Sequence, residues 1–365
     1  MRKKLQILPS LCVVFLFVSS LSFSQRLPHR SGGAANSARS VSAGATVFAT
    51  DLRFPRGVKF GPDARLYVAE SGLGGEDNTI GLCDQDPTFG PYHSGRTSRV
   101  TSFDLQGNRT VVVDNLPSSI DIFGETFGAA DVAFLGNTLY ILTNGSGCSH
   151  GVSYANNGIL RVNGGSLTQI NDLSQWTQTH PVANPPCCDF DAEGVWWTLN
   201  TNNGALYTNN ANTGDFVRVA ADGTTTRVID TSATEGHIVL TGVALRGNFY
   251  VANLGLFPIT PGSSSLYKIL PDHTLSKLFD GLTAVISLVV KDGKFYALET
   301  STEADFPVPG SGKIVRISDS GDITDVFTGL TFPTAMTVGP DGALYVSEFG
   351  YGDPGFGRIL RVTLN

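Results

Sequence analysis

The stretch LRFPRGVKFGPDARLYVAE, residues 52–70, returns near the end of the chain as LTFPTAMTVGPDGALYVSE, residues 330–348. Each copy contains two short runs of β-forming residues joined by a Pro-Asp turn. Four weaker copies lie between them, and each centres on a large apolar residue followed by tyrosine. These are Leu139-Tyr140, Leu206-Tyr207, Phe249-Tyr250 and Phe295-Tyr296. An internal repeat of this kind indicates a fold built from similar structural units.

A second shared element, a basic residue followed by a β-branched one, comes after each copy. It occurs at Arg99-Val100, Arg161-Val162, Arg218-Val219, Lys268-Ile269, Arg316-Ile317 and Arg361-Val362. With the runs that follow, each copy has about four short antiparallel strands, and the tyrosines of the later copies recur every 43 to 49 residues. Six such copies predict an all-β protein, a six-bladed β-propeller. A helical solenoid is excluded, because no apolar period near 3.6 residues is present.

The two ends of the repeat array predict how the ring closes. The last copy ends at Leu364 without an outer strand, and residues 45–50 form a lone strand before the first copy. We expect the N-terminal strand to pair with the last blade, which removes the exposed strand edges that favour aggregation. The propeller therefore occupies residues 45–365.

The composition favours a large folded core. The chain of 365 residues is 41% hydrophobic and only 16% charged, which excludes a disordered chain. Its formal net charge of −7 argues against a nucleic-acid partner, since such proteins carry a basic surface.

The N-terminus predicts export. Arg2, Lys3 and Lys4 precede an apolar stretch at 11–18, and small residues follow at Ser22 and Ser24, as in a secretory signal peptide. We expect a signal peptide over 1–24, a flexible leader over 25–44, and a secreted or periplasmic mature protein. A membrane anchor is disfavoured, because the apolar stretch is shorter than the roughly 20 residues that span a bilayer.

Four cysteines follow the predicted cleavage site: Cys83, Cys148, Cys187 and Cys188. An even number in an exported chain suggests disulfides, and four cysteines allow three pairings. A bond between the adjacent Cys187 and Cys188 would close a strained ring. We therefore expect each of them to reach a different loop, at Cys83 and at Cys148. A zinc site is the alternative, although no histidine lies beside them at ligand spacing.

The F-P-x-G-x-x-F-G-P-D-x-x-L-Y-V-x-E runs and the Gly-rich, cysteine-containing insertion after the first resemble the ScyD/ScyE-like family of secreted bacterial proteins. More broadly, the pattern is similar to six-bladed NHL, gluconolactonase-like and strictosidine-synthase-like propellers. The family is named after cyanobacterial gene clusters for the pigment scytonemin. The resemblance implies the fold and a secondary-metabolite context, and it supplies no catalytic residues.

One face of the predicted propeller concentrates the long insertions. The starts of first strands and the ends of second strands share a face in this fold, and the segments 71–98, 143–157 and 172–190 lie beside them. Long loops on a rigid scaffold commonly carry function. All four cysteines fall in these segments, so we expect a disulfide-stapled rim around a central funnel.

Aligned strand ends on this face predict a ring of oxygen ligands. The second strands end at Glu70, Thr143, Asn210, Asn253, Glu299 and Glu348, and the first strands start at Arg56, Asp131, Glu193, Thr241, Ser287 and Thr334. Carboxylates and amides suit calcium. The candidate metal ligands are Glu70, Asp131, Glu193, Asn210, Asn253, Glu299 and Glu348. Loop 71–98, rich in Gly and acidic residues, is a second place for calcium, without EF-hand spacing. The alternative is that these acids cap turns or pair with arginines such as Arg56.

Three residues are candidate ligand contacts: Arg56, His237 and Trp196. Trp196 and Trp197 alternate faces of one strand, so one of the two belongs to the core. No Gly-x-Ser-x-Gly elbow, phosphate loop or dinucleotide fingerprint is present. We therefore expect a binding or accessory protein whose rim holds a small molecule, a glycan or a protein partner. The alternative is a metal-assisted hydrolase of lactone-like esters, by analogy with six-bladed lactonases.

Overall fold

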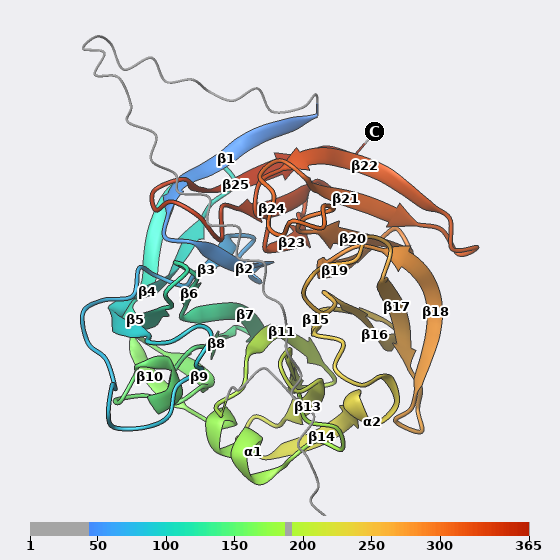
Figure 1. Ribbon diagram of the computed structural model, residues 1–365. Helices are drawn as coiled ribbons and strands as arrows, with labels where there is room; N and C mark the ends of the chain where they lie inside the picture. Colours follow the sequence, from blue (N-terminus) through green and yellow to red (C-terminus); the bar gives the residue numbers. More distant parts are fainter. Residues whose placement is uncertain (1–43, 187–191, 365) are drawn as a thin grey trace, which may run out of the picture. The chain divides into compact units, whose positions relative to one another are not determined.

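The repeats fold into six antiparallel sheets arranged around a central axis (Figure 1). The computed structural model describes residues 44–186 and 192–364. The predicted six-bladed β-propeller is confirmed. Within the described ranges, no helix is both long enough and apolar enough to cross a membrane.

The first two blades carry the longest insertions. Blade one consists of β2 (Pro55–Phe60), β3 (Leu66–Glu70), β4 (His93–Phe103), β5 (Arg109–Ile120) and the short β6 (Thr126–Phe127). Blade two consists of β7 (Ala129–Leu135), β8 (Thr138–Thr143), β9 (Gly158–Asn163) and β10 (Ser166–Gln169), with the 3-10 turn η1 (Cys148–His150) between β8 and β9.

The middle blades are shorter and more regular. Blade three consists of β11 (Trp196–Asn202), β12 (Ala205–Asn210), β13 (Asp215–Val219) and β14 (Thr225–Asp230). Blade four consists of β15 (Leu240–Arg246), β16 (Asn248–Asn253), β17 (Ser264–Ile269) and β18 (Leu275–Leu282). Helix α1 (Leu173–Thr179) precedes blade three, and α2 (Ser232–Glu235) precedes blade four. Asp172 caps α1 by accepting a hydrogen bond from the Gln175 N–H, the usual role of an N-cap residue.

The last blade is completed by the start of the chain. Blade five consists of β19 (Val285–Lys291), β20 (Lys294–Glu299), β21 (Gly312–Ile317) and β22 (Ile323–Leu330). Blade six consists of β23 (Ala335–Val338), β24 (Leu344–Glu348), β25 (Gly357–Val362) and, as its outer strand, β1 (Ala45–Leu52). β1 pairs antiparallel with β25, which confirms the predicted closure by the N-terminal strand.

Close backbone approach and apolar packing hold this closure. A Cβ on Gly357 would lie 2.3 Å from the Leu52 carbonyl oxygen, so only glycine allows the two backbones to meet here. Leu52 is 1% exposed and packs in one cluster with Val58 of blade one and Tyr345 of blade six. The first strand of the chain therefore ties the first blade to the last.

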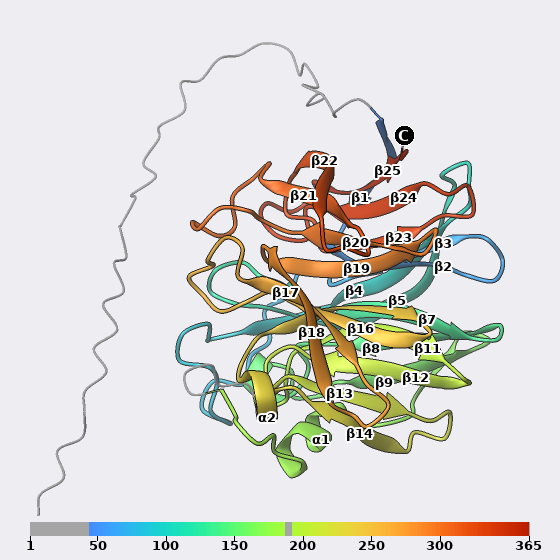
Figure 2. The same ribbon diagram turned by 90° about the vertical axis from the view of Figure 1, so that its right-hand side faces the viewer.

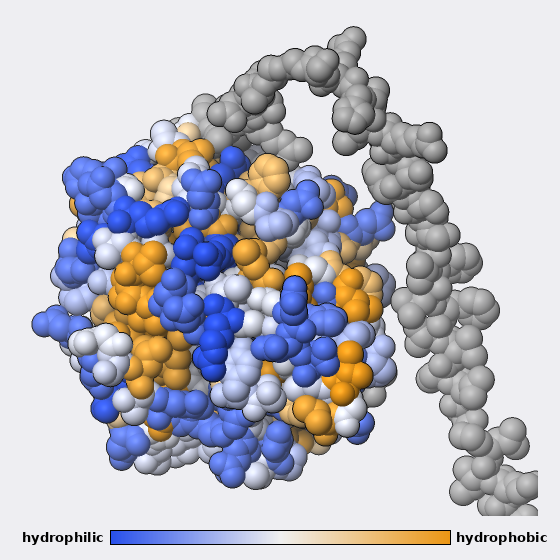
Figure 3. All heavy atoms as spheres, turned by 90° about the vertical axis from the view of Figure 1, so that its left-hand side faces the viewer, coloured by the Kyte–Doolittle hydropathy of each residue, from blue (hydrophilic) through white to orange (hydrophobic). Residues whose placement is uncertain are grey.

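The two faces of the propeller differ. Figure 2 shows the long connections on one side of the disc and short hairpins on the other; we call the first side the loop face. The outer side formed by blades one and two shows apolar residues in small groups between hydrophilic ones (Figure 3), as on most protein surfaces. The loop face is therefore the place to look for a site.

Closure by β1 makes a stability prediction. Leu52→Ala removes a buried side chain from the junction of the first and last blades, so we expect the free energy of unfolding to fall by about 2–5 kcal/mol. Val47→Ala, on the same strand but 45% exposed, should change it by less than about 0.5 kcal/mol. Urea unfolding of both variants measures the difference, and equal effects would contradict the closure.

Candidate functional site

One position in each first strand lies beside the propeller axis. In five blades this position directly follows the residue that pairs with the last residue of the second strand. In the sixth blade the repeat sequence identifies it. The six equivalent residues are Arg56, Ala130, Trp197, Thr241, Ile286 and Thr334. We call them the axial ring.

Two cavities meet at the axial ring. The loop-face cavity, of about 410 Å³, is lined by the long loops and by the starts of first strands. The central cavity, of about 270 Å³, is lined by the first strands themselves. The axial-ring residues that line both are Arg56, Trp197, Ile286 and Thr334.

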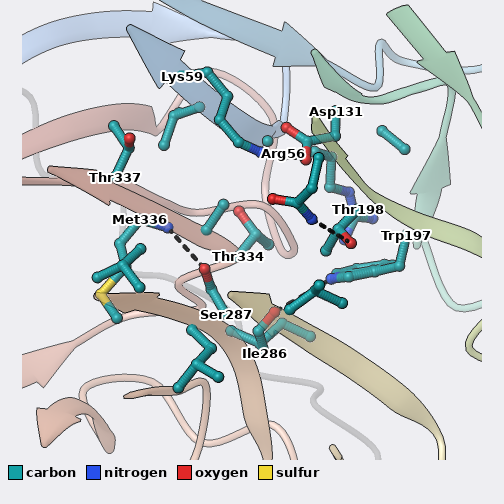
Figure 4. Close-up of a pocket in the computed structure, with 18 of the residues that line it drawn as sticks. Arg56, Lys59, Asp131, Trp197, Thr198, Ile286, Ser287, Thr334, Met336 and Thr337 are labelled. Atoms are coloured by element: carbon teal, nitrogen blue, oxygen red, sulfur yellow. Dashed lines mark hydrogen bonds and ion pairs between the residues drawn. The ribbon is translucent and has the colours of Figure 1, made fainter. Parts of the chain in front are cut away.

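Direct contacts join three of these four residues across the axis (Figure 4). The Arg56 guanidinium carbon lies 5.4 Å from the centre of the Trp197 ring, within the range of a cation–π contact. The Trp197 Nε1–H donates to the Ile286 carbonyl oxygen at 3.3 Å. These side chains form the floor of the loop-face cavity.

Aromatic side chains dominate the wall of the loop-face cavity. Among residues 44–186 and 192–364, nine line it: Phe89, Tyr92, Phe123, Phe127, Trp197, Phe257, Phe306, Phe332 and Tyr351. Several touch edge to face: ring centres are 5.0 Å apart for Phe257 and Phe306, and 5.6 Å apart for Phe332 and Tyr351. Such pairs are favourable and hold their rings in place.

A buried carboxyl group lies among these rings. Asp121 is 7% exposed, and its Oδ1 accepts hydrogen bonds from the N–H groups of Phe123 and Glu125, at 2.9 and 2.8 Å. Burial raises the pKa of Asp121 to about 6, because an ionised carboxylate loses hydration there. Asp86 and Glu125 also line the cavity.

Arg56 supplies positive charge at the floor. Its Nη2 donates to the Thr126 carbonyl oxygen at 2.5 Å and lies 3.4 Å from Oε1 of Glu125. The side chain is buried, and burial lowers its pKa from the ordinary value, since desolvation disfavours the charged form. The predicted ligand contact Arg56 therefore does line the loop-face cavity.

The central cavity contains one candidate metal ligand, Asp131. Its Oδ2 lies 2.8 Å from Nζ of Lys59 and accepts the N–H of Leu199 at the same distance. Lys59 also donates to the Leu199 carbonyl oxygen at 2.9 Å. Asp131 therefore already has a cationic partner.

Three other candidate ligands brace their own blades. Glu70, Glu299 and Glu348 end second strands and are buried. Each carboxylate accepts a backbone N–H at the entry to its blade; the donors are Arg53, Thr283 and Thr331. Each also forms an ion pair with a cation of the third strand; the partners are Arg99, Lys313 and Arg358.

The remaining candidates hold loops. Asn210 Oδ1 accepts the N–H groups of Val195 and Asn212, both at 3.1 Å, and Asn253 Oδ1 accepts the Ser265 N–H at 2.8 Å. Glu193 accepts a hydrogen bond from the Ser149 hydroxyl. Over the ranges 44–186 and 192–364, no three His, Cys, Asp or Glu side chains are placed to hold a metal ion. As placed, the seven residues form no calcium cage, and the calcium hypothesis stays a prediction.

The tryptophan assignment is corrected. Trp196, the predicted ligand contact, is fully buried in the core between blades, whereas Trp197 lines both cavities. Adjacent residues of a strand face opposite sides, and the pairing of Trp196 with Asn210 sets which one faces the axis.

Three alignments of first-strand starts are also corrected. The axial positions of blades two and five are Ala130 and Ile286, where the sequence alignment places Asp131 and Ser287. A β-bulge follows this position in blades one to five alike, so the bulge does not account for the displacement in blades two and five. In blade three the displacement is larger, from Glu193 to Trp197.

His237 lies outside both cavities, in the segment between α2 and β15. Its Nε2 is buried and has no hydrogen-bond partner within the described ranges. Burial lowers its pKa, because the protonated ring would lose hydration.

The predicted disulfide pairing is wrong for two of the cysteines. Cys83 bonds to Cys148, with Cα atoms 6.1 Å apart, so neither can pair with Cys187 or Cys188. The loops that carry them follow the second strands of adjacent blades and meet elsewhere too, since Thr79 Oγ1 donates to the Cys148 carbonyl oxygen at 2.6 Å. Cys187 and Cys188 lie outside the described residues.

Sequence reasoning missed the aromatic lining. Phe332 belongs to the repeat, but most of the other rings come from irregular connections such as 71–92, 256–260 and 301–311. The signal available was the abundance of Phe, 22 residues, several of them in polar loops.

Comparison with known proteins shows the fold alone. The chain matches no protein-family model and no curated protein sequence. Among solved structures it is similar to regucalcin from Agrobacterium tumefaciens, described as a calcium-binding protein (14% identity, 88% of this chain and 94% of that chain, TM-score 0.56). It is also similar to an oxidoreductase of the glucose dehydrogenase type from Thermus thermophilus (16%, 87% and 99%, 0.55). A gluconolactonase from Xanthomonas campestris is a third (11%, 88% and 89%, 0.52).

Asp121 predicts a pH dependence of stability. Its folded pKa, about 6, lies above the ordinary value near 4. The folded state therefore binds more protons between these values, and stability falls as pH rises through that window. Asp121→Asn should unfold at a higher temperature than wild type at pH 7.5 and at an equal temperature near pH 4.

The control is Asp353→Asn, a change at an exposed position. Thermal unfolding of wild type and both variants from pH 4 to 8 measures the difference. Melting temperatures of Asp121→Asn and wild type that change in parallel with pH would contradict the raised pKa of Asp121.

Proposed function

We propose that this propeller binds a planar aromatic small molecule in the loop-face cavity. The observation that carries the proposal is the lining of nine aromatic side chains, counted over the described part of the chain, around about 410 Å³. Small-molecule sites are concave, mostly apolar and largely formed in advance, with volumes of roughly 300–1,000 Å³. Aromatic walls favour flat ligands, because rings stack or meet edge to face.

Polar groups at defined depths would orient such a ligand. The Arg56 guanidinium lies at the floor and suits a carbonyl or phenolate oxygen. The Asp121 carboxylate lies nearer the loops and accepts hydrogen bonds from hydroxyl or N–H groups. A glycan or a protein partner at the same face remains the other expectation, but an apolar cavity of this size favours the small molecule.

We further propose that the protein is exported and acts on or carries a secondary metabolite, as its resemblance to the ScyD/ScyE-like family suggests. The Cys83–Cys148 disulfide supports export, because such bonds persist in oxidising compartments. The structural neighbours support only the propeller.

The proposed binding predicts a loss of affinity when one aromatic ring of the cavity is removed. Tyr351 lines the cavity and stacks edge-on against Phe332, so Tyr351→Ala should weaken binding of 2-naphthol by about tenfold, which is about 1.4 kcal/mol. Phe356→Ala is the matched control, since Phe356 is 60% exposed and outside the cavity. Isothermal titration calorimetry measures both. Equal affinities for the two variants would place any binding elsewhere, and no binding by wild type to naphthols, indoles or flavonoids would overturn the proposal.

The alternative proposal is a metal-assisted hydrolase of lactone-like esters. Its support is the shared fold with a gluconolactonase and with a calcium-binding protein. It predicts that calcium raises the unfolding midpoint of the chelated protein, since a ligand at 100 times its Kd adds about 2.7 kcal/mol. Asp131→Asn should reduce that rise, because Asp131 is the candidate ligand facing a cavity. An unchanged midpoint with calcium would remove this alternative.

A further inference from the structure

We infer that Trp197 sets the depth of the loop-face cavity and so limits the length of the ligand, an inference that rests on the binding proposed for that cavity. The indole lines both cavities and reaches across the propeller axis from blade three to Ile286 of blade five. Trp197 is then a residue that determines specificity by length, at the far end of the cavity from the loops.

The axial ring alternates in size around the propeller. Blades one, three and five contribute large side chains at this position: Arg56, Trp197 and Ile286. Blades two, four and six contribute small ones: Ala130, Thr241 and Thr334. Six large side chains would overfill the axis, and six small ones would leave it open. The alternation lets three side chains meet there.

The small axial residue of blade four, Thr241, leaves room for the indole. Trp197 belongs to blade three, yet its Nε1–H donates to Ile286 of blade five at 3.3 Å. The ring therefore passes over Thr241, the axial residue of the blade between them. Figure 4 shows the indole directed at the Ile286 backbone.

The indole is fixed at both its edge and its face. The hydrogen bond to Ile286 holds the Nε1 edge, and the Arg56 guanidinium covers the ring face at 5.4 Å. Arg56 is itself held by the Thr126 carbonyl oxygen and Glu125. On the strand, the neighbouring Trp196 is fully buried, which fixes the backbone beneath. A side chain held in this way closes the channel in the resting protein.

The space beyond the indole could receive a longer ligand. The central cavity adds about 270 Å³, and its wall combines aliphatic residues with Lys59, Asp131 and Ser287. Removing the indole joins this volume to the loop-face cavity. A longer rod with a polar far end would then find both apolar walls and hydrogen-bonding groups.

The test uses rigid para-linked phenols of one, two and three rings: phenol, 4-phenylphenol and 4-hydroxy-p-terphenyl. Calorimetry should show that wild type binds one of the two shorter probes and excludes the terphenyl. Trp197→Ala should gain at least tenfold in affinity for the terphenyl. Trp197→Phe, which keeps a ring across the axis, should stay close to wild type.

Trp176→Ala is the matched control, because Trp176 stacks on His180 and lines neither cavity. Thermal unfolding first shows that each variant folds, and Trp197→Leu replaces Trp197→Ala if that variant does not. An unchanged length preference in the folded Trp197 variant would overturn this inference and leave the proposed binding intact.

A wild type that binds none of the three probes would instead count against the proposed function. Crystals pressurised with xenon then test, without any organic probe, whether Trp197 separates the two cavities. Separate xenon sites above and below Trp197 in wild type, merging into one continuous region in the Trp197→Ala variant, would support it. Continuous xenon density across the axis in wild type would overturn it.

Discussion

A buried glutamate at the end of the second strand organises three of the six blades. Each carboxylate joins the N–H at the entry to the blade to a cation on the third strand. The residue after that N–H has a positive φ, as Phe54, Ala284 and Phe332 show, a conformation unfavourable for residues other than glycine. The buried hydrogen bond offsets this cost, because leaving the carboxylate or the N–H unpaired would cost more. In these three blades the start of the first strand, and with it the axial residue Arg56, Ile286 or Thr334, depends on this contact.

The candidate site is built on that fixed frame. First strands deliver Arg56 and Trp197 to the axis, and their backbones are set by pairing with the second strands. The walls come from connections of very different length, two of which are joined by the Cys83–Cys148 bond. A rigid floor with elaborated walls is an arrangement in which loops can change ligand preference without disturbing the fold.

The fold could be predicted because each copy of the repeat contains the β-forming runs that become the strands of one blade. The equivalence of Glu70, Asn210 and Glu299 also followed from the sequence, since second strands end without bulges. The direction of their side chains did not, because the hydrogen bonds at the blade entry are contacts between distant segments. The alignment placed Asp131 and Ser287 one residue beyond the axial positions Ala130 and Ile286, because neither blade has the Phe-Pro pair that marks the position in blades one and six. The aromatic wall could not be predicted, because loop sequences have no regular hydrophobic period.

The axial ring also explains why the repeats diverge. A protein of six identical blades has sixfold symmetry, and a sixfold axis can hold no side chain of its own, because any group near it would appear six times. Alternation of large and small axial residues lowers that symmetry to a pseudo-threefold arrangement. The three large residues also differ from one another, as do the small ones, and this lowers the symmetry further. Six identical blades could therefore not close the channel, and even the two most similar repeats differ in size at this position, with Arg56 in the first and Thr334 in the last.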